Sequence, residues 1–416
     1  TSLDVSYIEL MVANYPERIQ YLSLLKELCG NDLSAHSGSV MDAQSKTSET
    51  NEPVLTLPYD LTRPGRYLSF SFYYRKPGLE MKTSPALHFT DWAPPELRIG
   101  HLRTGNDGRE SLLLMSASHW GIHHDIDSLN IYYWKKGHEI LSDLGYLWDH
   151  PLKPQNKRTV AHNTVVINEK DQLEKGRGGD ILFFKTSDHV KAMEMSSDAY
   201  QEAKLYRRTS AIIDHGNGRN YVVDFFRVEG GEKQDYVFHA SAPSCEVIGL
   251  KPHPSGDIQL YDFKNLRSAD AAATWKTTWK SNEKMNCMAW SVSSKGERIY
   301  IADGWGQRDW KNSDIGATIP YIIRRCEGSS SKVFISVFEG YEGNEPFVRN
   351  VKLIDEKGII KVETNIGTDY IMSALDTNTL KTGKGKGSKD LSGHFAAISF
   401  QKETPVWDFV VTDNDR

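Results

Sequence analysis

Short runs of β-branched and aromatic residues recur through most of the chain and constrain its fold more than any other feature. Examples are YLSFSFYY, LNIYYW, DILFFKT and NYVVDFFRV, which are separated by turn-forming Gly, Asn and Asp residues. Such runs at regular spacing indicate an all-β sandwich or a stacked-sheet domain. The stretches DHGNGRN and EGGEKQD contain the residues with positive φ that hairpins require. We therefore expect a mostly β chain, built as a large antiparallel multi-sheet β-sandwich.

The first thirty residues differ, because their apolar residues have helical spacing. This spacing extends from Ile8 to Leu28, and Pro16 is expected to open the second of two helices. The polar stretch from Asn31 to Thr56 is typical of a linker or surface loop. A polar break near residues 305–318 could separate a final sheet from the rest. The expected parts are a helical segment and linker (1–55), a main β-sandwich (56–315) and a smaller C-terminal β-sheet region (316–416).

Composition excludes several functional classes. A net charge of −5 argues against a globally basic nucleic-acid binder. No apolar run approaches the roughly 20 residues that a membrane-spanning helix needs. The N-terminus TSLDVSYIELM lacks the basic and apolar regions of a signal peptide. The four cysteines show no CxxC spacing, which argues against a zinc ribbon or a disulfide-rich scaffold.

Ionisable residues crowd into GIHHDIDSLN, at positions 121–130, directly before a strand-like IYYW. The crowded residues are His123, His124, Asp125 and Asp127. Burying them is costly unless they are paired, hydrogen-bonded or bound to a metal. Asp127 could instead fix the loop by accepting hydrogen bonds from its backbone N–H groups. The residues alone leave open whether the stretch is a site or a charged, solvated loop.

Two more polar positions stand near strand ends: Asp143 in LSDLGY and His162 in RTVAHNTVVIN. Sequential antiparallel strands usually pair, so Asp125, Asp143 and His162 are expected to lie together. Two carboxylates and one imidazole make a plausible divalent metal site, with zinc as the default ion. Two structural interpretations compete: Asp143 could cap the turn at Gly145, and a lone histidine is more often structural than a ligand.

The stretch HHDIDSLNIYYWKKGHEILSDLGY followed by RTVAHNTVVIN resembles the heparinase II/III family of polysaccharide lyases. The family pattern is close to H-x-H-x-D-x-L, a strand, Gly, a second strand, D-x-G, and later R-x-x-x-H-N-T-V-V. The positions that fit are Leu129, Gly137, Asp143, Gly145, Arg158, His162 and Asn163. The similarity is strongest over residues 97–240. It implies the C-terminal β-sandwich of such a lyase, with the short helical segment as a remnant of an α/α toroid.

The resemblance also implies a metal centre. Its ligands would be Asp125, Asp143 and His162, where Asp125 replaces the second histidine of the family pattern. A shift of one residue would make His124 the ligand instead. Zinc is expected, although two carboxylates and one imidazole also accept calcium or manganese. The ion is expected to be structural.

The family's reaction is β-elimination at a glycosidic bond next to a uronic acid. The substrate carboxylate must be neutralised, and a Tyr or His must move protons. His123 corresponds to the family's first histidine, which lies in the active-site cleft. Tyr146 follows a tight turn and could face the same cleft. Both are candidate catalytic residues, although Tyr146 could simply pack over the turn.

Two further residues are candidates for binding substrate. Arg158 could bind a substrate carboxylate, or it could pair with Asp127 or Asp149 to hold the loop. His239, in the strand DYVFHA, could reach substrate or could lie inside its sheet.

The resemblance implies a polysaccharide lyase, or the C-terminal part of one, that acts on a uronic-acid-containing glycan. Two alternatives remain from the residues: a non-catalytic, metal-stabilised carbohydrate-binding β-domain, and a metal-dependent hydrolase whose ion keeps an open position. The expected partner is an acidic polysaccharide or oligosaccharide, and no nucleic acid. The family resemblance implies a periplasmic or secreted location in a bacterium.

Overall fold

The structure is a computed structural model in two compact units, Thr1–Phe89 and Thr90–Arg416. The residues it describes are 5–29, 90–106, 108–118, 124–145, 147, 150–174, 178–280, 284–309, 313–328, 331–355, 358–382 and 389–416. The expected linker and the run YLSFSFYY lie outside these residues. No helix in the described ranges is long and apolar enough to cross a membrane.

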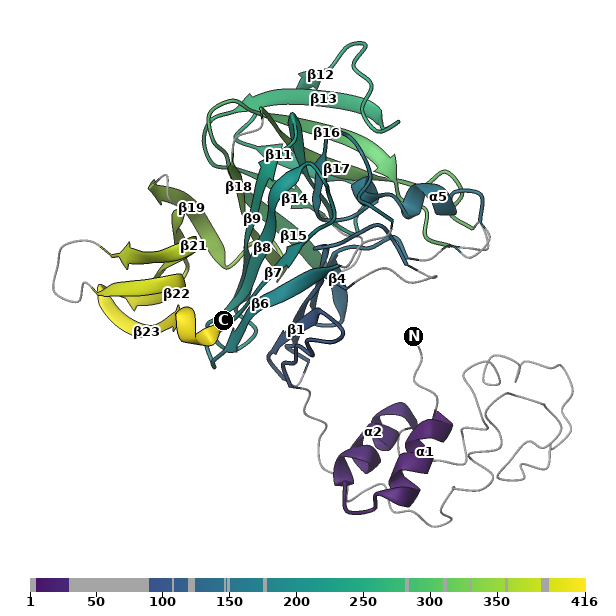
Figure 1. Cartoon of the computed structure of the whole chain (residues 1–416), viewed down its shortest axis with the longest axis vertical. Helices are drawn as coiled ribbons and strands as arrows, with labels where there is room; N and C mark the ends of the chain where they lie inside the picture. Colours follow the sequence, from purple (N-terminus) through teal and green to yellow (C-terminus); the bar gives the residue numbers. More distant parts are fainter. Residues whose placement is uncertain are drawn as a thin grey trace, which may run out of the picture. The chain divides into compact units, whose positions relative to one another are not determined.

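The described part of the first unit contains two short helices, α1 (Val5–Asn14) and α2 (Ile19–Cys29), which contact each other (Figure 1). Their apolar contact is formed by Ile8, Val12 and Leu25, all of which are buried. The helical spacing in the sequence therefore corresponds to helices that pack through one apolar face.

The turn between these helices differs from the expectation. The second helix begins at Ile19 and not at Pro16. The backbone N–H of Tyr15 still donates to the carbonyl of Met11 at 2.9 Å, so the first helix closes only there. Pro16 consequently lies in the turn.

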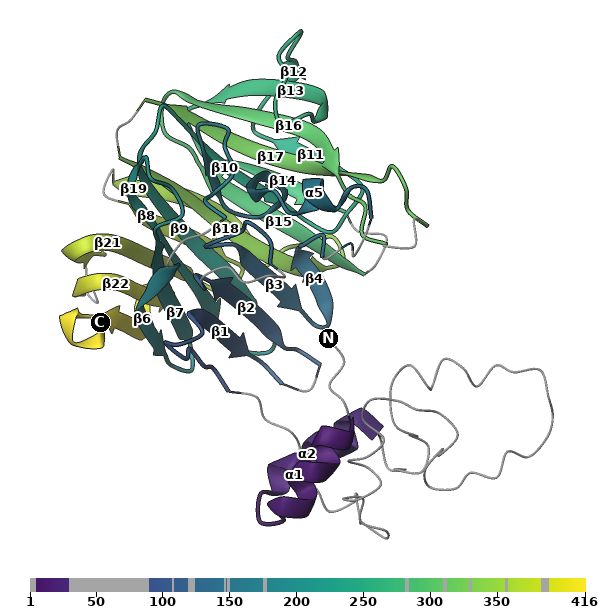
Figure 2. The ribbon, with the colours of Figure 1, turned by 45° about the vertical axis from the view of Figure 1, so that its right-hand side comes forward.

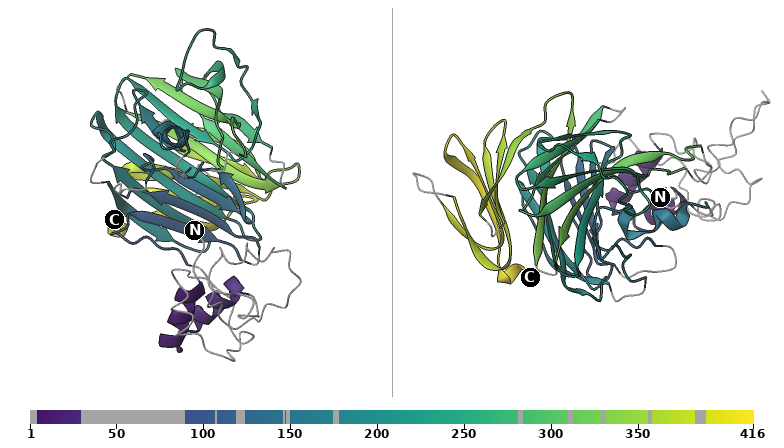
Figure 3. Two further views of the ribbon diagram at one scale, coloured as in Figure 1. Left: turned by 90° about the vertical axis from the view of Figure 1, so that its right-hand side faces the viewer. Right: turned by 90° about the horizontal axis from the view of Figure 1, so that it is seen from above.

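In the described part of the second unit, four antiparallel sheets form three layers (Figures 1 and 3). The first layer holds two sheets. The four-stranded sheet contains, in spatial order, β1 (Ile99–Thr104), β2 (Ser111–Ser116), β3 (Ile131–Lys135) and β4 (His138–Leu141). The six-stranded sheet contains β12 (His253–Pro254), β13 (Lys264–Ala271), β16 (Glu297–Trp305), β17 (Thr318–Glu327), β10 (Lys233–His239) and β5 (Val165–Ile167).

The middle layer is one eight-stranded sheet. Its strands, in spatial order, are β11 (Cys245–Ile248), β14 (Trp275–Trp279), β15 (Met285–Val292), β18 (Lys332–Glu342), β9 (Asn220–Gly230), β8 (Ala203–Asp214), β7 (Val190–Ser197) and β6 (Gly179–Thr186). The outer layer is a five-stranded sheet of β19 (Val348–Asp355), β20 (Ile359–Thr364), β21 (Thr368–Lys381), β22 (Asp390–Gln401) and β23 (Thr404–Val411). The described residues of this unit also form three short helical turns: α5 (Lys153–Asn156), η3 (Thr159–Ala161) and η4 (Asp413–Asp415).

The middle sheet is buried on both faces, which explains its continuous apolar runs. In β9, Val222 and Phe226 pack in the core shared with the first layer. Val223 and Phe225 pack in the core shared with the outer sheet. Alternate residues of a strand point to opposite faces, so NYVVDFFRV fills two cores at once. The expected mostly β, antiparallel multi-sheet fold is confirmed.

The outer sheet begins later than the expected boundary between residues 315 and 316. That boundary falls between β16 and β17, which pair with each other in the first layer. The next strand, β18, belongs to the middle sheet. Both β17 and β18 contribute buried apolar residues to the cores of these two layers. The separate sheet therefore starts only at Val348.

The β3–β4 hairpin determines where the polar motif lies. The two strands pair from Lys135 opposite His138, so the start of β3 and the end of β4 lie at the same end of the hairpin (Figure 2). A bridge between Leu141 and Ala240 connects this end to the six-stranded sheet. In that sheet β5 pairs with β10. The segments before β3, after β4 and before β5 therefore meet.

Candidate metal centre

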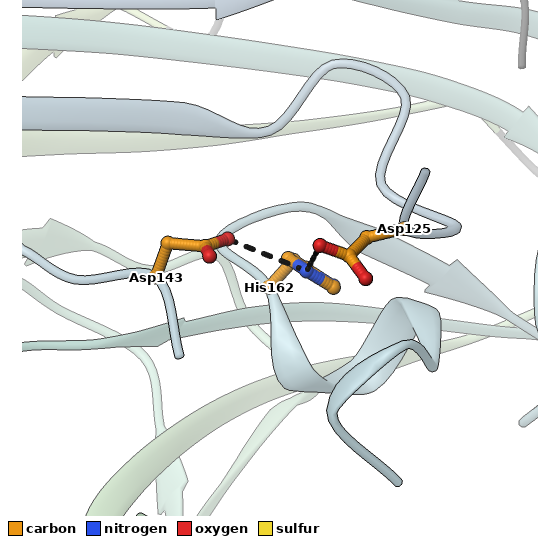
Figure 4. Close-up of side chains that lie close together, drawn as sticks. All are labelled: Asp125, Asp143 and His162. Carbon is orange, nitrogen blue, oxygen red and sulfur yellow. Dashed lines mark ion pairs between the residues drawn. The ribbon is translucent and has the colours of Figure 1, made fainter. Parts of the chain in front are cut away.

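Asp125, Asp143 and His162 come together where these three segments meet (Figure 4). One ligand atom from each residue lies within 4.8 Å of the other two. The Nε2 atom of His162 is 3.4 Å from Oδ2 of Asp143 and 3.8 Å from Oδ2 of Asp125. The structure thus brings together the three residues that the sequence singled out.

His162 is buried and its ring orientation is fixed from behind. Its Nδ1 lies 3.0 Å from the backbone carbonyl oxygen of Arg158, which accepts a hydrogen bond from that nitrogen. The Nε2 atom then faces the two carboxylates, as in metal sites where a backbone carbonyl orients a ligating histidine. Burial alone would lower the pKa of His162, but the hydrogen bond to Asp125 and the charge of Asp143 raise it to about 9. The carboxylates therefore favour a positive charge at this position, whether from a proton or from an ion.

The two carboxylate oxygens of Asp143 have different surroundings. Its Oδ1 accepts the backbone N–H of Gly145 at 2.7 Å, so the residue does cap the turn. Its Oδ2 is buried and has no hydrogen-bond partner within the described residues. Burial raises the pKa of Asp143. An orphaned buried carboxylate oxygen that faces an imidazole is the kind of group a cation would satisfy. The capping and ligand interpretations are compatible, because they use different oxygens.

The donor set and its spacing fit a divalent cation. A tetrahedral zinc site with bonds of about 2.1 Å separates its ligand atoms by about 3.4 Å. The separation between His162 and Asp143 matches this value, and that between His162 and Asp125 is slightly wider. Calcium and manganese also accept two carboxylates and one imidazole. Three protein ligands leave at least one further position for water.

The other two residues of the crowded motif that are described have different roles. Asp127 accepts hydrogen bonds from the hydroxyl of Tyr132 at 3.0 Å and from the side-chain amide of Asn130 at 3.5 Å. Among the described residues, the partners of its carboxylate are thus side chains, and not the backbone N–H groups that the loop interpretation expected. His124 does not belong to the three-residue cluster, which uses Asp125.

Both candidate catalytic residues, His123 and Tyr146, lie outside the described residues. In the sequence, each stands close to a member of the cluster: His123 precedes Asp125 by two positions, and Tyr146 follows Asp143 by three. Any ion that holds the cluster together would therefore hold the two segments that carry them.

Among the described residues, Arg158 pairs with Asp171 and lies 4.0 Å from Asp262, and it does not pair with Asp127. Its Nε lies 3.2 Å from Oδ2 of Asp171, and its guanidinium lies 5.7 Å from the ring centre of Trp305. Asp171 also accepts the backbone N–H of Thr159, so it fixes the turn that leads to His162. The other expected partner, Asp149, lies outside the described residues.

His239 is fully buried, which corrects the expectation that it contacts substrate. Its Nδ1 is 2.7 Å from the hydroxyl of Ser142, and its Nε2 is 2.8 Å from the carbonyl oxygen of Ala161. Burial lowers the pKa of His239 to about 3, so the ring is neutral. Because Ser142 and Ala161 adjoin Asp143 and His162, this histidine supports the cluster from the interior.

Sequence reasoning missed Glu139 and Arg308. The Oε1 atom of Glu139 accepts the backbone N–H of Asp143 at 3.1 Å. The same carboxylate is bound by the guanidinium of Arg308, which follows β16 and is distant in sequence. Only the pairing of sheets in the fold brings these two residues together, so no local pattern signals them.

The chain is similar to a known protein family and to a known lyase. Residues 97–313 match the family described as Heparinase II/III-like, C-terminal. An exo-oligoalginate lyase from Saccharophagus degradans is 22% identical over 335 residues, which are 67% of this chain and 43% of that protein.

Two solved structures resemble the fold. A heparan sulfate lyase from Pedobacter heparinus aligns with a TM-score of 0.50 at 14% identity, over 71% of this chain and 43% of that one. A structure of heparinase III gives a TM-score of 0.50 at 14% identity, over 70% and 44%. The chain thus spans less than half the length of each of these relatives, and the structural likeness concerns the fold.

Proposed function

The chain belongs to the heparinase II/III-like C-terminal family, and from this membership we propose that it is a polysaccharide lyase, or the C-terminal part of one. Its proposed substrate is an acidic glycan that contains uronic acid. The names of the exo-oligoalginate lyase and the heparan sulfate lyase support this substrate class. We also propose a periplasmic or secreted location, in line with extracellular glycan degradation.

The proposed reaction is a β-elimination. A base removes the proton at C5 of the uronate, a double bond forms between C4 and C5, and the C4–O bond breaks. The leaving oxygen takes a proton from an acid. The difficult part is to stabilise the charge that develops on the carboxylate when C5 loses its proton, which requires positioned hydrogen-bond donors or positive charge. Proton transfer by positioned side chains supplies a further part of the rate.

We assign these proton-transfer duties to His123 and Tyr146. The observation that carries the proposal is the convergence of Asp125, Asp143 and His162 in the segments that adjoin both residues. A divalent ion, with zinc preferred, would be held by these three side chains and would supply a fixed cross-link between the segments. The protein side chains would bind the glycan and move the protons.

An assay of the chain with oligoalginate and with heparan sulfate tests the proposal. The expected product has a new unsaturated uronate end, which is detected by its ultraviolet absorbance. Because elimination adds no water, the masses of the two product fragments sum to the mass of the starting glycan. New reducing ends whose mass includes water would support a hydrolase instead. Retention of glycan without any cleavage would support a binding domain. The absence of both cleavage and retention would contradict the assigned substrate class.

A further inference from the structure

Asn163 directly follows the candidate ligand His162 and is fully buried. Its backbone N–H donates to Oδ1 of Asn130 at 2.9 Å. Its side-chain amide nitrogen donates to the backbone carbonyl of Ser142 at 2.9 Å. Its side-chain oxygen accepts the backbone N–H of His239 at 2.9 Å. Its backbone carbonyl also accepts a hydrogen bond, from Arg208, so every polar group of Asn163 is bonded to another segment.

These partners are the segments that carry the candidate metal ligands. Asn130 ends the loop that begins at Asp125, and its side chain also lies 3.5 Å from Oδ2 of Asp127. Ser142 directly precedes Asp143 in the chain. Asn163 itself follows His162. The side-chain amide nitrogen of Asn163 lies 2.9 Å from the carbonyl oxygen of Ser142 and 3.4 Å from that of Ile131. With the backbone N–H that donates to Asn130, the residue therefore connects the segments behind all three candidate ligands.

The carbonyl of Asn163 is held by Arg208, a fully buried residue of β8. One guanidinium nitrogen, Nη1, donates to the carbonyl oxygens of Asn163 at 2.5 Å and of Leu129 at 2.7 Å. The opposite edge of the guanidinium binds both carboxylate oxygens of Asp224, at 2.8 and 2.9 Å. The middle sheet thus provides a rigid base for the loop before β3 and for the segment before β5.

We propose that Asn163 is the positioning residue of the metal centre, and that it sets the separation of Asp125, Asp143 and His162 without touching the ion. The inference rests on the metal centre proposed above, but not on the lyase reaction. Zinc requires its ligand atoms within a few tenths of an ångström of fixed distances. Loss of the side-chain contacts to Ser142, Ile131 and His239 would let the segments that carry the ligands shift relative to one another, and metal affinity would fall. Substitution of residues that support metal ligands without touching the ion typically lowers metal affinity by about 10- to 100-fold.

The test compares the zinc affinity of the full chain with that of Asn163→Ala, measured by competition with a chromophoric chelator in the absence of glycan. Asn130→Ala tests the backbone link separately, because it removes the oxygen that accepts the N–H of Asn163, together with the contact of Asn130 to Asp127. Asn220→Ala is the matched control. Asn220 is also fully buried, and its side-chain oxygen accepts from the hydroxyl of Ser111 at 2.9 Å, but within the described residues its side chain does not bond to the cluster segments.

The proposal predicts an affinity about 10- to 100-fold weaker for Asn163→Ala, a smaller loss for Asn130→Ala, and an unchanged value for Asn220→Ala. Thermal unfolding of the metal-free proteins separates this effect from general destabilisation. Equal affinities for wild type and both cluster variants would overturn the inference alone. If Asn163→Ala does not fold, the Asn130→Ala result decides. Failure of wild-type protein to bind zinc, calcium or manganese would overturn this inference together with the metal centre, whereas absence of lyase product would affect neither.

Discussion

The Nε2 atom of His162 lies 3.4 Å from Oδ2 of Asp143, and that carboxylate oxygen has no other partner in the described residues. The Nδ1 atom of the same ring is already engaged with a backbone carbonyl. A neutral imidazole nitrogen and a carboxylate oxygen are both acceptors, so they attract each other only through a shared proton or a cation. Nearby Asp125 adds a second negative charge to the same point. This contact is therefore the most direct place to test the metal centre.

Removal of a ligand should abolish metal binding. We expect wild-type protein to retain one zinc ion after gel filtration, whereas Asp143→Ala and His162→Ala should retain none, because two remaining ligands hold the ion weakly. Elemental analysis of the purified proteins measures this directly. Asp127→Asn is the control, since that carboxylate binds Tyr132 and lies outside the cluster. Metal retained at full occupancy by both ligand variants would contradict the assignment.

Chelation should lower thermal stability only when the cluster is intact. An ion that binds the folded chain but not the unfolded chain stabilises the fold by about 2.7 kcal/mol when its free concentration is 100 times its dissociation constant. We expect a chelator to lower the Tm of the wild type in calorimetry and to leave that of His162→Ala unchanged. A wild-type Tm that does not depend on metal would show that the three side chains are held by protons and hydrogen bonds alone.

The grouping of Asp125, Asp143 and His162 could be predicted from sequence because each residue stands beside a strong strand signal. Asp125 precedes β3, Asp143 follows β4, and His162 precedes β5, so the pairing of neighbouring strands brings them close. Their spacing along the chain was sufficient for this, because antiparallel strands that follow each other usually pair. The residue class and the approximate location were therefore available without coordinates.

The support behind the ligands could not be predicted in the same way. Arg208 lies in the run YRRTSAII, where nothing in the local pattern marks it as buried, because arginine is mostly exposed unless it is paired. In the structure it is fully buried and reaches the backbone of Leu129 and Asn163 from the middle layer. Its burial depends on the order β18-β9-β8 and on the stacking of two layers. Neither follows from local residue patterns. Local patterns also do not show that β17 and β18 belong to the two inner layers, so that the outer sheet starts only at Val348.

Replacement of Arg208 should be among the most destabilising changes in the chain. Arg208→Met leaves the carboxylate of Asp224 buried and removes its bidentate partner. Loss of one partner of a buried ion pair costs about 3–5 kcal/mol. Chemical denaturation should show a loss of this size in the free energy of unfolding. Arg298→Met is the comparison: Arg298 and Asp270 are both exposed and 3.9 Å apart, and such pairs contribute about 1 kcal/mol or less. Equal losses in the two variants would contradict the role of Arg208.

Lys135 should make stability depend on pH in alkaline solution. This lysine is 4% exposed, its ammonium donates to the carbonyl of Asn220 at 2.9 Å, and burial lowers its pKa from 10.5 to about 8. Between these two values the unfolded chain binds the proton and the folded chain does not. Protons therefore favour unfolding in this window, and the contribution of Lys135 to stability rises as the pH increases from 8 to 10.5. The expected slope is about 1.4 kcal/mol per pH unit.

Other groups titrate in the same range, so the measurement is a difference between proteins. The free energy of unfolding of the wild type, minus that of Lys135→Met, should rise by about 2 kcal/mol between pH 8 and pH 9.5, as follows from about 1.4 kcal/mol per unit. Lys136→Met is the matched control, because the neighbouring Lys136 is partly exposed and pairs with Glu342 at 2.6 Å. The rise should be larger for Lys135→Met than for Lys136→Met, because only Lys135 is buried. The prediction would be wrong if the wild-type minus Lys135→Met difference were flat or fell with pH. Either result would mean that burial does not lower the pKa of Lys135 in the folded chain.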